Sequence, residues 1–338
     1  MMAETSPIVE QVDRSASQGW LRRVGRLAAP FIGLFLVLVI FTAIEPGSFP
    51  TVRNGQTIAV QTVVVGIGAL GMCFVIVCGG IDLSIGSVIA LASVAGAMTL
   101  DAGYGPTAAM AMAGGTGAFC GLINGGMVTA LRIPPFIVTL GMLGIARGLA
   151  KLLAGNQRIA PPPESLGWLE GFVDKTPAIT WLQVAPAAWC LLVTAILAGF
   201  VLRRTAFGVQ VVAIGSSEAT ARLCGVPVAR TKILVYVLCG LGAGLAGAVT
   251  LGRLGVGDPT TAVGLELQII AAVVIGGASL SGGEGGILGT MIGAFMLSCL
   301  SAGCTLAGID NSIQEIIIIG GIIVAAVTID GLRQRRNR

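Results

Sequence analysis

Long uncharged runs separated by short polar stretches dominate the chain. Residues 27–44 form an uncharged run of 18 residues, and Arg53, Asp82 and Asp101 bound further uncharged runs of 28 and 18 residues. A helix needs about 20 apolar residues to cross a bilayer. The pattern therefore predicts an all-α polytopic membrane protein with about ten transmembrane helices, some of them broken or re-entrant. We expect these spans in residues 27–44, 54–81, 83–100, the latter part of 102–131, 136–154, 184–202, 233–252, 265–280, 286–305 and 313–329.

The composition agrees with a membrane-embedded fold. Of the 338 residues, 55% are hydrophobic and 11% are charged, whereas soluble domains carry about 25% charge. The 51 glycines suit close contacts between helices in a bilayer. The chain has no histidine, which excludes His-dependent catalytic triads and His-ligated metal sites. The eight cysteines are scattered and form no C-x-x-C pair, so we expect neither a metal site nor a cofactor in this chain.

The distribution of basic residues predicts the orientation. Ten spans place both termini on one side of the membrane. Of the 20 Lys and Arg residues, 14 fall on that side and six on the other, so the positive-inside rule makes the first side cytoplasmic. We expect a cytoplasmic N-terminal tail (1–26), a single transmembrane domain (27–330) with a cytoplasmic loop (203–232), and a basic cytoplasmic tail (331–338).

The polar stretch over residues 203–232 carries signals for one short helix. Ser216 is a favourable N-cap because its hydroxyl can accept from free amides of the first turn, where the helix dipole also favours the Glu218 carboxylate. Gly225 suits a left-handed position at the C-terminal end, and Pro227 prevents continuation. Such a helix either belongs to an ordinary cytoplasmic loop or docks on a partner protein.

The side chains of this short helix suit docking by shape. Glu218 and Arg222 stand four residues apart and can form an ion pair that stiffens the helix. Ala219 and Ala221 permit close approach of a partner, and Leu223 offers an apolar anchor.

Two distant segments share a pattern that weakens helices. Gly79-Gly-Ile-Asp-Leu-Ser84 and Gly276-Gly-Ala-Ser-Leu-Ser281 both match G-G-x-x-L-S and follow apolar, β-branched runs. Broken helices at corresponding places in two halves of a chain point to a transport pathway. We expect the two segments to line or brace a translocation path, with coincidence in a glycine-rich chain as the alternative. The candidate residues are Gly79, Gly80, Asp82, Ser84, Gly276, Gly277 and Ser281.

Asp82 is the most informative acid because it separates two apolar runs. A carboxylate at the centre of an isolated span costs about 2.5–3.5 kcal/mol, so Asp82 should lie at a helix break, near an interface or facing the bundle interior. It can either hydrogen-bond a hydroxylated solute or fix the break by accepting from free amides. Asn124 presents a similar choice, and we expect a hydrogen bond between helices as its role.

Two enzymatic motifs are incomplete. Gly255-Val-Gly-Asp258 matches the G-x-G-D of intramembrane aspartyl proteases, but the second Asp of that chemistry follows a Tyr, and Tyr104 and Tyr236 are followed by Gly and Val. The sequence also has no G-x-x-x-x-G-K-[ST] phosphate-binding loop. The sequence therefore predicts a transporter subunit rather than an enzyme, and any ATP that drives it must be bound by another protein.

Four stretches resemble the membrane permease subunit of bacterial ABC sugar importers of the ribose/xylose/arabinose/galactose type. They are residues 79–87, 133–142, 213–225 and 275–283, and the likeness covers nearly the whole chain. Small departures occur at Thr220 and Cys224, where Ala and Ser are expected.

The resemblance implies a multi-pass protein of the bacterial inner membrane that carries a monosaccharide or related polyol. It implies three protein partners: a cytoplasmic ATPase that binds ATP, a periplasmic sugar-binding protein and a second permease copy. It also implies contact with membrane lipid and no binding of nucleic acid. It further implies that the helix around Glu218, Ala219 and Gly225 is a coupling helix that enters a groove on the ATPase. The resemblance does not identify the sugar.

Two other function classes remain open at this point. An ion-coupled secondary transporter acting alone needs ionisable groups inside the membrane; Asp82 is the strong candidate, while Glu266 and Glu315 lie near span ends. An intramembrane enzyme would need a nucleophile–base pair, which the sequence does not show.

Overall fold

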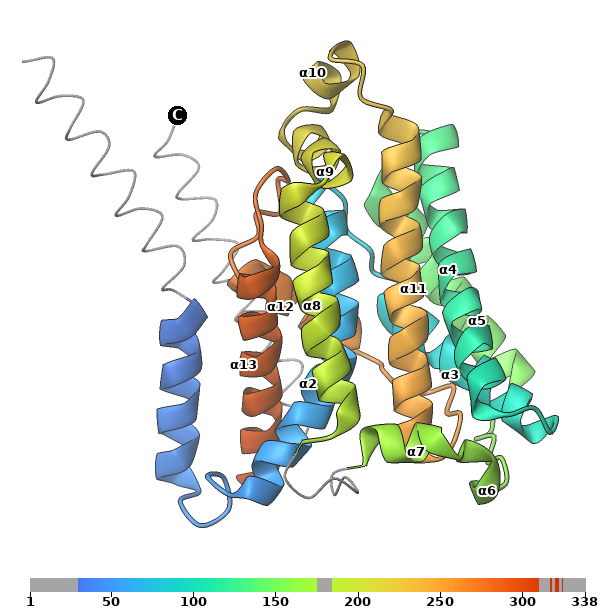
Figure 1. The fold of residues 1–338 in the computed structure, drawn as a ribbon, viewed down its shortest axis with the longest axis vertical. Helices are drawn as coiled ribbons and strands as arrows, with labels where there is room; N and C mark the ends of the chain where they lie inside the picture. Colours follow the sequence, from blue (N-terminus) through green and yellow to red (C-terminus); the bar gives the residue numbers. More distant parts are fainter. Residues whose placement is uncertain (1–29, 175–183, 310–316, 318–319, 322–323, 325–338) are drawn as a thin grey trace, which may run out of the picture.

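The computed structural model describes residues 30–174, 184–309, 317, 320–321 and 324 (Figure 1). The described chain is helical apart from its connections and one isolated β-bridge between Ile159 and Gly257. This confirms the all-α class for these residues. The predicted tails, most of the predicted span 313–329, and Glu315 lie outside the described residues.

Six described helices are long and apolar enough to cross a membrane, and four shorter ones are apolar. The number of about ten spans and the location of the termini stay predictions. The six long helices are α2 (Val52–Val77), α4 (Pro106–Ala130), α5 (Pro135–Leu153), α8 (Pro186–Arg204), α11 (Val228–Leu254) and α13 (Ile287–Leu306). The shorter apolar helices are Pro30–Ile44, α3 (Ile85–Asp101), α9 (Ala206–Ser216) and α12 (Leu265–Ile275). Three short helices also lie in loops, namely α6 (Pro163–Leu166), α7 (Trp168–Val173) and α10 (Glu218–Leu223).

Proline and glycine set several helix boundaries. Pro106, Pro135 and Pro186 each begin a helix, where a missing N–H is harmless because first-turn amides have no partner within the helix. Gly255 has φ +69° and ends α11 in the left-handed conformation that glycine tolerates. These local signals explain why several predicted spans match the observed helices within a few residues.

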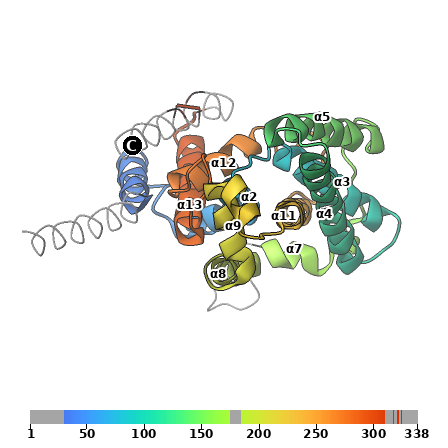
Figure 2. The same ribbon diagram turned by 90° about the horizontal axis from the view of Figure 1, so that it is seen from above.

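The bundle is built around α2 (Figure 2), whose most apolar 18-residue stretch is 89% buried. It packs against α8, α11, α12 and α13. α11 packs against α4 as well as against α2. The contact between α11 and α4 is made through facing glycines: a methyl group added to Gly117 of α4 would overlap the backbone of Gly240 and Gly244 of α11. Small residues thus allow two backbones to approach closely, which is how helices associate in lipid.

Residues 255–264 between α11 and α12 form a non-helical connection, in agreement with the gap between the predicted spans 233–252 and 265–280. It runs alongside α3: Gly257 lies against Ala97, and the carbonyl of Ala262 lies against Gly86 near the other end of α3. Pro259 and the left-handed Gly264 prevent a helix here. α12 begins at Leu265 as predicted but ends at Ile275, before Gly276 and the left-handed Gly277, so the predicted span 265–280 is too long at its C-terminal end.

Candidate functional site

The polar stretch 203–232 contains two helices, so the prediction of one short helix was wrong. Thr205 starts α9 by accepting a hydrogen bond from the amide of Gly208 at 3.2 Å. Ser216 is the last residue of α9 and donates to the carbonyl oxygen of Val212 at 3.0 Å, so it does not cap the second helix. That role falls to Ser217, whose extended backbone separates α9 from α10.

Both ends of α10 are capped. The Ser217 hydroxyl accepts from the amide of Thr220 at 3.3 Å. At the other end Gly225 has φ +78°, as predicted, and its amide donates to Arg222 O at 3.1 Å. The amide of Val226 donates to Ala221 O at 3.0 Å, which completes the two-bond Schellman pattern. A helix of only six residues is thereby held in a single shape.

An acid on α10 joins this helix to α11. Glu218 Oε1 accepts from Arg222 Nη2 at 2.8 Å, which confirms the predicted pair, and Glu218 Oε2 accepts from Lys232 Nζ at 2.7 Å. The Lys232 hydrogen bond is the largest reason why the pKa of Glu218 lies below its usual value; partial burial opposes this effect, and Arg222 adds to it. Sequence reasoning missed Lys232 because helical spacing does not connect residues across the turn at Pro227.

The outer surface of α10 is largely as predicted, with one correction. Leu223 is 89% exposed, and Ala219 is exposed beside it. Ala221 is only 4% exposed, so it packs against the protein and is unavailable to a partner. Its position follows from the helical period, which places residue 221 on the face opposite residues 219 and 223.

Four glycines bring the start of the first G-G-x-x-L-S segment and the two residues directly after the second segment against the end of α9. Gly79, Gly282 and Gly283 have φ of +84°, +84° and +77°, and Gly215 is the fourth. A Cβ atom added to Gly215 would overlap Val77 O and lie 2.5 Å from the amide nitrogen of Gly283. A Cβ added to Gly282 would lie 2.9 Å from Gly79 Cα. We call Gly79, Gly215, Gly282 and Gly283 the glycine junction.

The remaining residues of the second segment shape the turn from α12 to α13. Gly276 packs backbone to backbone on Gly289 of α13, and Gly277 has φ +95°. Ser281 Oγ lies 3.0 Å from Ser279 Oγ. These residues border the glycine junction, whereas Asp82 belongs to a separate cluster.

The structure gathers Asp82, Ser84 and Asn124 into one buried cluster. Asp82 Oδ1 accepts from the Ser84 amide at 2.8 Å and from the Ser84 hydroxyl at 2.5 Å. Asn124 Nδ2 on α4 donates to Ser84 Oγ at 3.0 Å, which confirms a hydrogen bond between helices. All three side chains are at most 3% exposed. Asp82 therefore holds the chain at the start of α3, where free amides are available.

Two further polar side chains around this cluster, Thr139 and Tyr236, were not predicted. Thr139 on α5 donates to Ile81 O at 3.2 Å. The Tyr236 hydroxyl lies beside Gly80, where an added Cβ would approach it to 2.5 Å. Within the described residues, the buried Asn124 Oδ1 and the Tyr236 hydroxyl have no hydrogen-bond partner. Periodicity could not have predicted these contacts, because they join α5 and α11 to the non-helical segment between α2 and α3.

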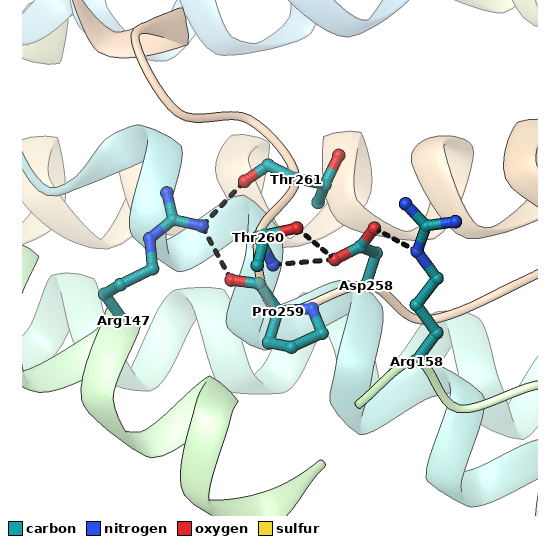
Figure 3. A network of polar contacts seen from close by, with 6 residues as sticks. All are labelled: Arg147, Arg158, Asp258, Pro259, Thr260 and Thr261. Carbon is teal, nitrogen blue, oxygen red and sulfur yellow. Dashed lines mark hydrogen bonds and ion pairs between the residues drawn. The ribbon is translucent and has the colours of Figure 1, made fainter. Parts of the chain in front are cut away.

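At the opposite end of α11, a polar cluster holds the segment between α11 and α12 (Figure 3). Asp258 accepts from the amide and hydroxyl of Thr260 at 2.8 and 2.6 Å and pairs with Arg158 Nε at 2.7 Å. Arg147 Nη1 donates to Pro259 O at 2.9 Å and Thr261 O at 2.6 Å. Asp258 of the G-x-G-D match thus serves to fix a loop.

These contacts also set the charge state of Asp258. Partial burial alone would raise the pKa of its carboxyl, but the Thr260 hydrogen bonds and the Arg158 pair outweigh burial and leave the pKa below its usual value. The described residues contain no group of three His, Cys, Asp or Glu side chains that could hold a metal ion.

The sequence belongs to a known permease family. Residues 55–327 match the family described as "Branched-chain amino acid transport system / permease component". A ribose import permease protein of Escherichia coli strain K12 is 35% identical over 95% of this chain and 97% of that protein. An L-arabinose ABC transporter permease protein of Azospirillum brasilense is 34% identical over 90% and 88% of the two chains. A fructose import permease protein of Rhizobium meliloti is 37% identical over 90% and 84%.

Among solved structures, an inward-facing metal-chelate type ABC transporter aligns with 91% of this chain and 99% of that chain, at 16% identity and a TM-score of 0.47. At this score the alignment adds nothing to the family assignment. The sequence matches alone confirm the resemblance to permeases of ABC sugar importers. Together with the six spanning-length helices, they identify a multi-pass protein of the bacterial inner membrane.

Proposed function

We propose that this chain forms the translocation path of an ABC importer for a monosaccharide or related polyol, and that a separate cytoplasmic ATPase docks on α10. The observation that carries this proposal is α10 itself: an exposed helix, capped at both ends and joined to the bundle on two sides. The relatives named as import permeases for ribose, arabinose and fructose support the class of substrate.

The connections of α10 supply a route for mechanical coupling. The Glu218–Lys232 pair links it to the start of α11, a 27-residue helix. Directly before α10, the end of α9 contributes Gly215 to the glycine junction, where Gly79 of the first G-G-x-x-L-S segment meets the residues directly after the second segment. A displacement of α10 would therefore reach α11 directly and both segments through α9. Packed backbones transmit such a displacement because interiors are close-packed and hardly compressible.

The proposed transporter needs partners beyond this chain. The ATPase supplies the ATP-binding motif that the sequence lacks, a periplasmic binding protein delivers the sugar, and a second permease copy completes the path within the lipid bilayer. Asp82 braces the path, since its Oδ1 atom accepts two hydrogen bonds from Ser84.

Co-purification tests the docking site. Ala219→Trp places a large side chain on the exposed face of α10 and should abolish both retention of the ATPase and sugar-stimulated ATP turnover. Ala108→Trp, at an exposed position in α4, is the matched control and should retain both. Glu218→Gln should weaken retention less than Ala219→Trp does. If Ala219→Trp behaves like Ala108→Trp, α10 is not the docking site.

A second candidate function is ion-coupled transport, and Glu266 is the observation that favours it. Its buried Oε2 atom has no hydrogen-bond partner among the described residues and lies against Gly86. Ion coupling would make uptake sensitive to a protonophore at constant ATP and insensitive to loss of the ATPase. ATP-driven import gives the reverse pattern in vesicles that contain both subunits.

A further inference from the structure

A cavity of about 210 Å³ lies between α2, α11, α12 and α13. Its wall includes Arg253 and Leu254, the last two residues of α11, whereas α10 is joined to the first turns of that helix. At 1.5 Å per residue, α11 is about 40 Å long. The cavity is therefore at the end of the molecule opposite the proposed ATPase site. The polar residues that line it are Gln61, Thr250, Arg253, Gln268, Ser298 and Ser301.

One residue that lines the cavity, Gln61, has a side-chain oxygen without a hydrogen-bond partner among the described residues. This Oε1 atom is buried. A buried, unpaired amide oxygen is destabilising unless a solvent molecule or ligand satisfies it. Gln268 places a second amide in the wall and is only 9% exposed. Gln61 of α2 and Gln268 of α12 thus line the same small space.

The hydroxyl groups of the cavity extend its capacity to accept hydrogen bonds. Ser298 donates to Ala294 O at 3.0 Å and Thr250 donates to Ala246 O at 2.8 Å. Each hydroxyl has used its single donor within its own helix, so its oxygen can still accept. Gln61, Ser298 and Thr250, which carry accepting oxygens, therefore line the cavity together with Arg253 and Gln268, which carry donor groups.

This mixture of donors and acceptors matches a neutral polyhydroxylated solute, because every hydroxyl of a sugar both donates and accepts. Among the described residues, the lining contains no carboxylate, and Arg253 disfavours cations. The volume equals the share of about seven liquid waters, which is enough for one monosaccharide. Apolar side chains such as Val64 and Leu265 complete the wall, as in ligand pockets generally.

One wall of the cavity is fixed by a hydrogen bond from a residue that does not line it, Arg147. Thr261 and Ala262 line the cavity, and Arg147 of α5 binds the carbonyl oxygen of Thr261. The cluster of Figure 3 thus positions one side of the cavity.

We infer that this cavity is a sugar-binding subsite within a single permease chain, which holds one neutral monosaccharide before it passes toward the α10 end. The inference rests on the proposed function and adds to it the residues that recognise the sugar, chiefly Gln61 and Gln268.

Protection of a reporter cysteine tests binding directly. In the purified full chain with Cys190→Ser and Cys224→Ser, the six remaining native cysteines are buried. Ser301→Cys then places one reactive thiol on the cavity wall. Ribose, arabinose or fructose should slow its alkylation in a saturable manner, and adding Gln268→Leu should remove the protection. Glu170→Cys, exposed on α7, is the control thiol and should react at one rate with or without sugar.

Two outcomes of the labelling experiment would overturn the inference. One is that none of the three sugars slows alkylation at Ser301→Cys. The other is that gluconate protects this thiol while neutral sugars do not, because the cavity would then bind anions through Arg253.

Transport by the assembled complex separates this inference from the proposed function. With the ATPase and the binding protein in vesicles, Gln61→Leu and Gln268→Leu should each lower sugar uptake about 3- to 10-fold, the loss expected for one hydrogen bond. Thr62→Val is the matched control: Thr62 is adjacent to Gln61 but bonds only within α2, to Ile58 O at 2.8 Å, and uptake should stay unchanged.

If the wild-type complex imports no sugar, the proposed function fails. If it imports sugar, both Leu variants import at the wild-type rate, and Ser301→Cys is unprotected, the cavity is not a subsite while the proposed function stands. The labelling measurement tests sugar binding even if a Leu variant is poorly folded, because the Ser301→Cys protein keeps both Gln61 and Gln268.

Discussion

The amide of Gly283 donates a 2.9 Å hydrogen bond to the carbonyl oxygen of Val77, the last residue of α2. The last carbonyls of a helix have no partner within it, so this bond satisfies one of them with a residue from the distant second G-G-x-x-L-S region. The two segments that share a sequence pattern are therefore also neighbours in space. Their meeting point is where α9 ends, directly before α10.

The glycine junction predicts a strict steric requirement at Gly215. In Gly215→Ala the new methyl group would overlap Val77 O, and relief by backbone movement should cost about 1–3 kcal/mol of stability. We expect a lower melting temperature and a loss of sugar-stimulated ATP turnover. Gly115→Ala is the control, because a Cβ at this position in α4 meets nothing within 4 Å. Equal behaviour of the two variants would show that the junction tolerates displacement.

The Asp82 cluster predicts a graded response. Asp82→Ala leaves the buried Ser84 amide and hydroxyl without their acceptor, which should destabilise the fold by about 1–3 kcal/mol and impair uptake. Asp82→Asn keeps one acceptor oxygen and should have a smaller effect. Thermal unfolding and uptake at matched membrane levels would measure both. Normal transport by Asp82→Ala together with Gly80→Leu would rule out a bracing role for this segment.

The ion pairs of Glu218 predict how α10 responds to pH. Its pKa in the folded protein lies below the usual value of 4.5, so the pairs stabilise the attachment of α10 above that value. Their contribution is lost as pH falls through the lowered pKa, when the carboxylate becomes protonated. Hydrogen exchange of α10 amides, corrected for intrinsic rates, should stay constant from neutral pH to about 4.5 and rise below it.

The Glu218→Gln variant provides the comparison. It should exchange faster than the wild type at neutral pH and lose the acid-dependent step. An acid-dependent step that persists in Glu218→Gln would assign it to another carboxyl group.

The predicted orientation can be tested with a native thiol. Cys224 is exposed at the end of α10 and should be inaccessible to a membrane-impermeant maleimide in intact cells. With Cys190→Ser in the background, Glu170→Cys on α7 should react from outside. Permeabilised cells serve as the positive control for Cys224. Labelling of Cys224 in intact cells would reverse the topology.

Arg147 predicts a local change in mobility at the opposite end of the bundle. Arg147→Gln removes the guanidinium that binds Pro259 O and Thr261 O, so amides of residues 255–264 should exchange faster and sugar uptake should fall. Lys151→Gln, one turn further along α5 at an exposed position, should change neither. If exchange in residues 255–264 is the same in both variants, Arg147 does not hold this segment.

The sequence by itself determined the features that depend on neighbouring residues. Uncharged runs of spanning length predicted the membrane helices, since burial of a charge in lipid is costly. Gly225 and Pro227 predicted the end of α10 because left-handed backbone and a missing amide are properties of single residues. Even here the N-cap was placed one residue early, since Ser216 and Ser217 are equivalent in sequence and only backbone geometry distinguishes them.

Only the tertiary structure decided which distant residues meet. Glu218 could be paired with Arg222 from helical spacing, but Lys232 reaches it because the chain turns back at Pro227. The glycine junction and the Gln61–Gln268 cavity each combine residues from opposite halves of the chain, and their hydrogen-bonding groups carry no local signal of partners. Packing of α2 between α8, α11, α12 and α13 sets these distances, because the arrangement of helices depends on the fit of whole surfaces.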